Sequence, residues 1–352
     1  MRRFLQLHLL TSYPPANLNR DDLGRPKTAV MGGVLRLRIS SQSLKRAWRT
    51  SDLFATSLQG HVGTRTKEMG IRIYRELLAK GIKEKDAMAW AGQIAGQFGK
   101  SKGADKNNPL AVLEIEQLAH FSPEEEEAIR QLNNTLAERR TGPEEGELQL
   151  LRKRHSAADI AMFGRMLASA PAYNVEAAVQ VAHALGVHRC QVEDDFFTAV
   201  DDLNDGQEDK GSAHMGDTAF GAALFYQYIC VDRQQLLANL GEDRPLADLA
   251  LRALLECAAT VAPGGKQNSF ASRAYASYML AELGDRQPRS LSVAFLRPVS
   301  GADLLVAAVR SIQQSVTQMD AVYGPCADLR EEMSVLDGRG TLSALQGFAI
   351  QE

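Results

Sequence analysis

Strand-like sequence lies near both ends of this 352-residue chain, and a long helical block separates the two parts. Residues 4–10 place leucines on one side at period two, which predicts a half-buried strand. Residues from about 58 to 186 read as almost wholly helical, and aromatic and β-branched sequence typical of a strand returns at residues 222–231. This order predicts an α+β fold whose strands share one core and whose helical block is an insertion.

The remaining elements follow from local periodicity and from turn residues. Residues 35–39 predict a second strand, with its three aliphatic side chains facing inward and Arg36 and Arg38 facing outward. Further predicted elements are helices at 174–186, 233–240 and 246–261, strands at 274–283 and 290–297, and a helix at 301–319. The C-terminal residues give little signal.

The segment Ser122-Pro123-Glu124-Glu125 carries several signals for the start of a helix. Serine is a preferred N-cap, proline fits the first helical position, and a glutamate three residues after the cap completes a capping box. Acidic side chains near the positive end of the helix dipole are stabilising, so this acidic cluster has a structural explanation.

Charge is distributed unevenly along the chain, although the formal net charge is only −3. Residues 1–50 contain ten lysines and arginines but only two acids, Asp21 and Asp22. Residues 193–209 contain eight acids and no lysine or arginine. One face of the protein can therefore be basic enough to attract a polyanion while the whole molecule stays near neutrality.

The cysteines and the hydropathy exclude several classes of protein. The cysteines, at positions 190, 230, 257 and 326, form no C-x-x-C pair, so we expect buried reduced thiols rather than a zinc site or a disulfide framework. No stretch approaches the roughly 20 apolar residues that span a bilayer, and no signal peptide is recognisable. The sequence predicts a cytoplasmic protein with no membrane contact.

The most informative stretch is residues 35–49, where the predicted strand runs straight into a helix that begins with two serines. Free N–H groups at a helix start bind anions, and small hydroxyl side chains let a phosphate come close. Lys45 and Arg49 lie one turn apart with Arg46 beside them, and no acid occurs between residues 23 and 51. The pattern favours phosphate recognition; a solvated basic helix face is the alternative.

The segment around Asp21 and Asp22 allows two interpretations. Adjacent carboxylates can hold a metal ion, but aspartates in a loop more often cap turns or pair with an arginine, here Arg20 or Arg25. We favour the structural interpretation and predict no metal site.

Two further stretches contain residues that could contact nucleic acid. Gly164-Arg165-Met166 interrupts an apolar run, and a methionine there either fills the core, which the sequence alone favours, or wedges between bases. Residues 196–216 predict a long projecting hairpin that includes Thr198 and His214. His214 is the one histidine considered for acid–base chemistry, and no nucleophile or second base accompanies it.

The loop at residues 263–268 resembles a phosphate-gripping loop only loosely, because the G-x-x-x-x-G-K-[ST] pattern is absent. It contributes Lys266 as a candidate contact. No H-E-x-x-H, G-x-S-x-G or G-x-G-x-x-G motif occurs anywhere in the chain, so no catalytic residue and no cofactor are predicted.

Together these segments resemble the repeated backbone subunit of the type I-E CRISPR Cascade complex, the CasC family of the repeat-associated RAMP superfamily. The strings I-S-S-Q-S-L-K-R at residues 39–46 and F-T-A-V-D-D-L at residues 197–203 are long enough to make chance agreement very unlikely. Order and spacing agree across roughly residues 1–55 and 156–270. Residues 58–155 and those after about 285 match in kind only.

The resemblance implies a hand-shaped protein. Its palm would be a modified RNA-recognition-motif (ferredoxin-like) domain formed by residues 1–57 and 219–352. Residues 58–186 would form helical fingers, and residues 187–218 a β-hairpin thumb. Copies would stack along a CRISPR guide RNA (crRNA), with each thumb displacing a base and reaching its neighbour.

The resemblance also implies which residues contact the RNA. The guide backbone would lie against the residues that begin the serine-capped helix and its basic face: Ser40, Gln42, Lys45, Arg46 and Arg49. Weaker assignments, by similarity, are Arg20, Lys27 and Lys266. Arg165, Met166 and Thr198 are the remaining expected RNA contacts, with Met166 and Thr198 framing the displaced base.

By the same resemblance the partners would be crRNA, target DNA that pairs with the guide, further copies of this chain, and other Cascade subunits. Those subunits would be the large, small, guide-capping and guide-processing ones, joined by a recruited helicase-nuclease. The function expected is that of a non-catalytic scaffold, not an enzyme. Two alternatives are a metal-dependent ribonuclease acting on guide or target RNA through Asp21, Asp22 or His214, and a self-associating protein that meets RNA incidentally.

Overall fold

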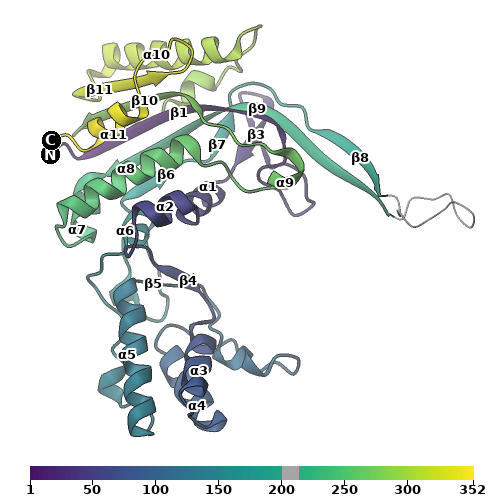
Figure 1. The fold of residues 1–352 in the computed structure, drawn as a ribbon. Coiled ribbons are helices and arrows are strands. Elements are labelled where there is room, and N and C mark those ends of the chain that lie inside the picture. The colour runs from purple at the N-terminus through teal and green to yellow at the C-terminus, as the bar shows by residue number, and fades with distance from the viewer. Residues whose placement is uncertain (200–213) are drawn as a thin grey trace, which may run out of the picture. The chain divides into compact units, whose positions relative to one another are not determined.

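A computed structural model describes residues 1–199 and 214–352, which form two compact units (Figure 1). Unit 1 comprises Met1–Phe54, Gln180–Val231 and Leu251–Glu352. Unit 2 comprises Ala55–Val179 and Asp232–Ala250. Sequence from both ends of the chain therefore meets in unit 1. The predicted palm, finger and thumb ranges stay a prediction.

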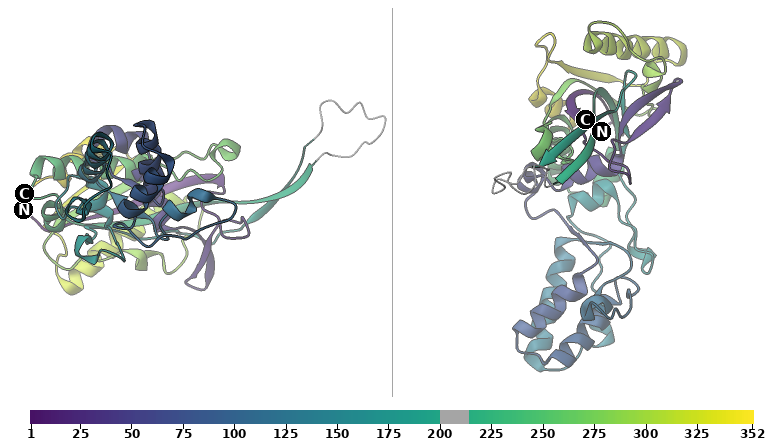
Figure 2. Two further views of the ribbon diagram at one scale, coloured as in Figure 1. Left: turned by 90° about the horizontal axis from the view of Figure 1, so that it is seen from below. Right: turned by 90° about the vertical axis from the view of Figure 1, so that its right-hand side faces the viewer.

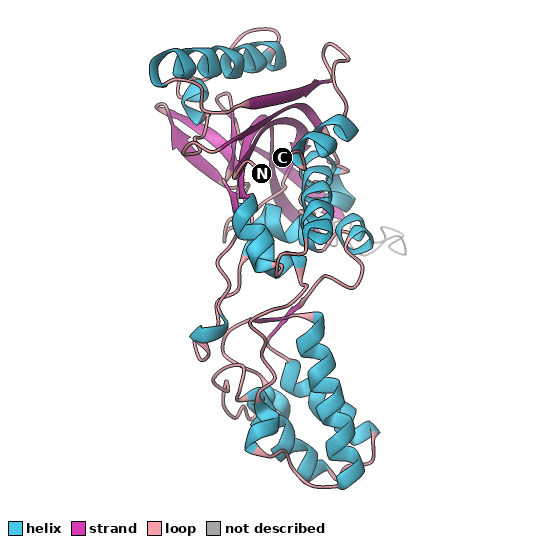
Figure 3. Ribbon diagram, turned by 90° about the vertical axis from the view of Figure 1, so that its left-hand side faces the viewer, coloured by secondary structure: helices cyan, strands magenta, loops and turns pink. Residues whose placement is uncertain are grey.

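Unit 1 is built on a large sheet, coloured magenta in Figure 3. In spatial order its strands are β11 (Leu329–Ser334), β10 (Ala276–Gly284), β1 (Phe4–Ala16), β9 (His214–Asp232), β7 (Ala184–Gly186), β3 (Val34–Ile39) and β2 (Thr28–Met31). β6 (Val179–Val181) and β8 (Glu193–Ala199) also pair with β9. The pairings of β10 with β1 and β11, of β3 with β2 and β7, and of β9 with β7 and β8 are antiparallel. The predicted α+β class is confirmed in part: the fold mixes helices and strands and contains an antiparallel sheet.

The first strand is buried on both faces, so the prediction of a half-buried strand is wrong. Leu5, Leu7 and Leu9 are fully buried, but so are Gln6 and His8 on the opposite face. That second face is covered by α10 (Leu304–Tyr323) and η4 (Ser292–Phe295), whose apolar residues share a cluster with those of β9 and β10. The covering helix comes from the far end of the chain, so the period of the strand itself cannot reveal it.

Polar side chains on that covered face are tolerated because they hydrogen-bond to one another. His8 Nδ1 lies 2.9 Å from the Tyr226 hydroxyl, and His8 Nε2 lies 3.1 Å from a carboxylate oxygen of Glu282. The same carboxylate accepts hydrogen bonds from Arg289 at 2.6 Å and from Arg330 at 2.7 Å. The network joins β1, β9, β10 and β11 in the interior of unit 1.

Arg36 faces the interior of unit 1, so its predicted outward orientation is wrong, whereas Leu37 and Ile39 are buried as predicted. Its guanidinium donates to the carbonyls of Gly186 and Phe295, each at 2.9 Å, and the residue is fully buried. Leu35, predicted inward, is 40% exposed. A buried guanidinium is tolerated here because each of its two Nη groups donates to a backbone carbonyl, although its Nε has no hydrogen-bond partner.

Two predicted elements are wrong in type. The predicted helix at 174–186 is instead an irregular segment with the short strands β6 and β7, because pairing with β9 and β3 overrides the helix propensity of its alanines. The predicted strand at 290–297 contains η4, and the backbone N–H of Leu291 donates to the Tyr226 hydroxyl rather than to a neighbouring strand.

The helices of unit 1 lie on both sides of its sheet (Figure 1). Those besides α10 are α1 (Ser41–Arg49), α9 (Gln267–Phe270), α11 (Leu342–Ala349) and most of α8 (Arg244–Thr260). α2 (Asp52–Ser57) leads from unit 1 into unit 2. β11 and α11 arise from the C-terminal sequence that gave little signal.

Unit 2 is mainly helical but includes a two-stranded sheet. Its helices are α3 (Met69–Ala79), α4 (Glu84–Ala95), α5 (Pro123–Arg139), α6 (Ala158–Phe163) and α7 (Arg233–Asn239), with short 3₁₀ turns η1 (Pro109–Leu113), η2 (Glu145–Leu148) and η3 (Pro171–Tyr173). The sheet pairs β4 (Thr64–Thr66) with β5 (Ala119–Phe121). The predicted capping box is confirmed: Ser122 Oγ accepts from Glu125 N at 3.3 Å, and Glu125 Oε2 accepts from Ser122 N at 2.9 Å.

All four cysteines are buried and free, as predicted. Within residues 1–199 and 214–352, no helix has the length and hydropathy needed to cross a membrane.

Candidate nucleic-acid interface

The start of α1 is fixed in place by hydrogen bonds at its N-cap. Ser40 has an extended backbone, and its Oγ accepts from Ser43 N at 3.3 Å. The backbone N–H of Ser40 donates to Asn19 Oδ1 at 2.8 Å, which ties the helix start to the loop before β2. Leu44 and Trp48 are buried and anchor the other side of the helix.

The exposed side of α1 is cationic along its length. Gln42 and Arg46 are exposed, and Lys45 and Arg49 are half-buried. The first turn contains no acidic residue, and the last turn contains Arg46 and Arg49. The positive end of the helix dipole and these side chains act in the same direction, so the surface favours an anion.

A second group of cations surrounds His183, in the turn between β6 and β7. Arg38 Nη1 donates to His183 Nδ1 at 3.0 Å, and Arg38 Nε donates to the Thr28 carbonyl at 3.3 Å. Although His183 is exposed, partial desolvation of its ring lowers its pKa, and the positive charges of Arg38, Lys27 and Lys45 lower it further. Lys27 and Lys45 were predicted as contacts, and the structure places both near one neutral imidazole.

His183 and Arg38 are missing from the residues predicted as contacts. His183 lies in the segment predicted as a helix, so nothing placed it beside β3. The alternation of Val179, Val181, Leu185 and Val187 was the available signal for strands there.

The loop before β2 packs against the loop that carries Lys266. A Cβ at Gly265 would fall 2.2 Å from the carbonyl oxygen of Leu18, so this close approach requires glycine. Lys266 has a left-handed backbone, and its Nζ donates to Thr218 Oγ1 on β9 at 3.3 Å. Three features therefore lie in one region of unit 1: the loop before β2 that includes Leu18 and Asn19, the start of α1, and the loop that carries Lys266.

We predict that Gly265→Ala destabilises unit 1 by about 1–3 kcal/mol, because the added methyl group must displace the Leu18 backbone. Gly264→Ala is the matched control, since a Cβ there meets nothing within 4 Å. Chemical denaturation of the full chain measures both. Equal stabilities of the two variants would contradict the described packing.

Asp21 caps a turn, as the favoured interpretation of this loop predicts. Its Oδ1 accepts from the backbone N–H groups of Leu23 at 3.0 Å and Arg25 at 2.9 Å. Arg25 pairs with Asp194 at the base of the β8–β9 hairpin, at 2.8 Å. Among the described residues, no group of three or more histidine, cysteine, aspartate or glutamate side chains is arranged to hold a metal ion.

The β8–β9 hairpin extends beyond the other strands of unit 1 (Figure 2). Thr198 is exposed and pairs with Met215, which is 64% exposed. Phe197 lies opposite Gly216, where a Cβ would fall 2.7 Å from its ring. Residues 200–203 of the string F-T-A-V-D-D-L lie outside the described residues, and the His214 side chain is not described.

Two of the predicted contacts lie in unit 2, and one of them is buried. Arg165 Nη1 donates to Glu125 Oε2 at 2.7 Å, and both side chains are completely inaccessible. Arg165 also donates to the carbonyls of His120, Arg152 and Tyr173. Because its guanidinium is buried and donates to these interior groups, we withdraw Arg165 as an RNA contact.

Met166 differs from its neighbour, because it is 75% exposed rather than part of the core that the sequence alone favoured. It lines a hollow of about 210 Å³ together with Phe98, Leu118 and other residues. An exposed methionine is available for contact with a base. Its joint action with Thr198, which lies in unit 1, stays a prediction.

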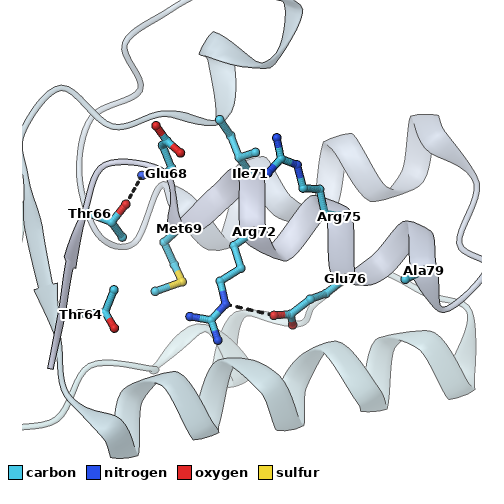
Figure 4. A pocket seen from close by; sticks show the side chains of 9 residues that line it. All are labelled: Thr64, Thr66, Glu68, Met69, Ile71, Arg72, Arg75, Glu76 and Ala79. Atoms are coloured by element: carbon cyan, nitrogen blue, oxygen red, sulfur yellow. Dashed lines mark hydrogen bonds and ion pairs between the residues drawn. The ribbon is translucent and has the colours of Figure 1, made fainter. Parts of the chain in front are cut away.

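Unit 2 also contains a larger hollow, of about 470 Å³, beside α3 (Figure 4). Arg72 and Arg75 line it, but Arg72 pairs with Glu76 at 3.2 Å and with Glu126 at 2.8 Å. Because the charge of Arg72 is compensated, this hollow does not have the excess of cations found around α1.

Comparison with known proteins identifies one matching family and solved structures that resemble this chain. A family described as CT1975-like protein matches residues 5–352. A solved chain titled "CRISPR RNA-guided surveillance complex, pre-nicking" is 28% identical with a TM-score of 0.84, and the match covers 98% of this chain and 100% of that one. A second, titled "CRISPR RNA-guided surveillance complex", is 27% identical with a TM-score of 0.60, covering 97% and 92%. No curated protein sequence matches.

Proposed function

This chain belongs to the CT1975-like protein family, and from that premise we propose that it is a non-catalytic backbone subunit of a type I-E CRISPR Cascade complex. In this role it binds the guide RNA, and several copies line the guide along its length. The match to chains of CRISPR RNA-guided surveillance complexes over nearly the full length supports the assignment to such an assembly.

The single observation that carries the proposal is the cationic surface at the start of α1. Its serine cap is held by Asn19, and Lys45, Arg46 and Arg49 follow without an acidic residue in the first turn. Such a surface binds phosphate and ribose and carries no information about base identity. A subunit that must accept any guide sequence needs this kind of contact.

The proposed function follows because this surface contacts the backbone of the guide and not its bases. If the protein holds only the guide backbone, the bases remain available to pair with target DNA, and base pairing reads the sequence. Ordering the guide beforehand reduces the entropy cost of that pairing. The exposed hairpin residue Thr198 and the exposed Met166 are suited to displacing and framing a base.

The remaining assignments are proposals of the same kind. We assign unit 1 as an RNA-recognition-motif-like palm, its β8–β9 hairpin as the thumb, and the helices of unit 2 as the fingers. The proposed partners are crRNA, target DNA, further copies, the other Cascade subunits and a recruited helicase-nuclease, all in the cytoplasm.

The purified full chain should bind two guide-length RNAs of unrelated sequence with equal affinity. The affinity should fall steeply with salt, because each neutralised phosphate releases counterions. The same incubations with Mg²⁺ should leave the RNA intact. Salt-independent or sequence-selective binding would contradict the scaffold role, and so would cleavage that Asp22→Ala abolishes.

A further inference from the structure

The turn between β6 and β7 places His183 beside Arg38 and close to Lys27. No carboxylate among residues 1–199 and 214–352 lies within ion-pair distance of Arg38 or Lys27. Arg38 instead donates from Nε to the Thr28 carbonyl and from Nη1 to His183 Nδ1. Uncompensated like charges repel one another, so this arrangement is most stable when an anion is bound.

The hydrogen bond to Arg38 fixes the protonation state of His183. A guanidinium has donors only, so Nδ1 must be the acceptor, and the neutral ring then carries its proton on Nε2. The charged groups that act on this ring are Arg38 on β3, Lys27 just before β2, and Lys45 on α1. On β9, burial raises the pKa of Tyr226 and Tyr228 far above neutrality, so both stay uncharged.

We propose that His183 is a further RNA contact, forming with Lys27, Arg38 and Lys45 a subsite for one phosphate of the guide, and that RNA binding there is coupled to uptake of a proton by its imidazole. This inference rests on the proposed guide-RNA function, which assigns no role to His183 or Arg38.

The coupling follows from the contacts. A phosphate in the subsite opposes the cationic field, so it favours the charged imidazole. The proton comes from solvent and binds at Nδ1, where it would face the Arg38 donor. Arg38 must then leave Nδ1, and its released donors can reach the phosphate.

The sign of the pH dependence follows directly. In the free protein the pKa of His183 is lowered, first by partial desolvation of the ring and then by Arg38, Lys27 and Lys45. In the complex the negative charge of the bound phosphate raises that pKa again. Binding therefore takes up a proton, and the affinity should rise as the pH falls through the pKa of the complex. A pKa difference of one unit between the two states gives at most a tenfold change.

The test compares full-length wild type with His183→Gln, using a fluorescent oligouridylate, whose bases and diester phosphates do not titrate near neutrality. We expect wild-type affinity to increase about three- to tenfold between about pH 8 and about pH 5.5. The response of His183→Gln should be flat over the same range, with an unchanged melting temperature. Arg38→Ala should bind more weakly, with its pH response shifted upward because the free imidazole loses its nearest positive charge.

The outcomes separate this inference from the function on which it rests. Salt-dependent binding with the same pH response in wild type and His183→Gln would overturn the inference alone. No binding of oligouridylate by wild type at low salt would overturn the proposed function and the inference together. A structural role of His183 in holding Arg38 would weaken binding equally at every pH, which also contradicts the proposal.

Discussion

Replacing Lys45 and Arg49 together by alanine should weaken RNA binding about 30- to 150-fold at moderate salt. Each charge-assisted contact to phosphate contributes about 1–1.5 kcal/mol once solvent screening is taken into account. Both side chains belong to the cationic face of α1, one turn apart. The affinity of the double variant for RNAs of different sequence should fall by the same factor, because phosphate contacts do not read bases.

Salt dependence distinguishes lost phosphate contacts from damaged folding. For a single strand, removing two contacts should lower the magnitude of the slope of log K against log salt by about 1.4. The matched control is Arg297→Ala with Arg310→Ala, which removes the same charge at exposed positions in and before α10. Equal loss of binding in the control would show that net charge, and not this surface, is responsible.

Replacing Arg165 by alanine should destabilise unit 2 by about 3–5 kcal/mol. The change leaves the Glu125 carboxylate buried without its guanidinium partner, and it removes the hydrogen bonds that Arg165 donates to the carbonyls of His120, Arg152 and Tyr173. Arg154→Ala is the matched control, since Arg154 is exposed and its loss should cost less than about 0.5 kcal/mol. Chemical denaturation, followed by a probe in unit 2, measures both.

A double variant distinguishes the cost of leaving a buried charge unpaired from the cost of losing the packing of the Arg165 side chain. Glu125→Gln with Arg165→Met removes both charges and keeps one acceptor oxygen, which can accept from Ser122 N, now bound to Oε2, or from Arg152 N, now bound to Oε1, but not from both. It should be more stable than Arg165→Ala alone, because no uncompensated charge remains buried. If the double variant were the less stable of the two, the buried charge would not be the main cost.

The sequence predicted the parts of the fold that depend on neighbours along the chain. The serine cap at Ser40, the capping box at Ser122 and the strand at residues 35–39 all follow from local rules, and the structure contains each of them. What it could not predict depends on distant partners. Arg36 turns inward because Gly186 and Phe295 present carbonyls to it, and both belong to segments whose type was predicted wrongly.

The same distinction separates the site residues that were predicted from those that were missed. Lys45, Arg46 and Arg49 were identified because they lie on one helix, where spacing alone sets the face. His183 was missed because only the β3–β7 pairing brings it beside Arg38. Arg165 was expected to contact RNA because of the family resemblance around residues 164–166, and the capping role of Glu125 gave no sign that Glu125 is also the buried partner of Arg165.

The most direct test of the account is a structure of the full-length protein assembled on RNA. We expect the sugar–phosphate backbone to pass the start of α1, with a phosphate within hydrogen-bond distance of Ser40, Gln42 or Lys45 and the bases turned away from the protein. An assembly in which another polypeptide covers α1 and the RNA runs elsewhere would contradict it.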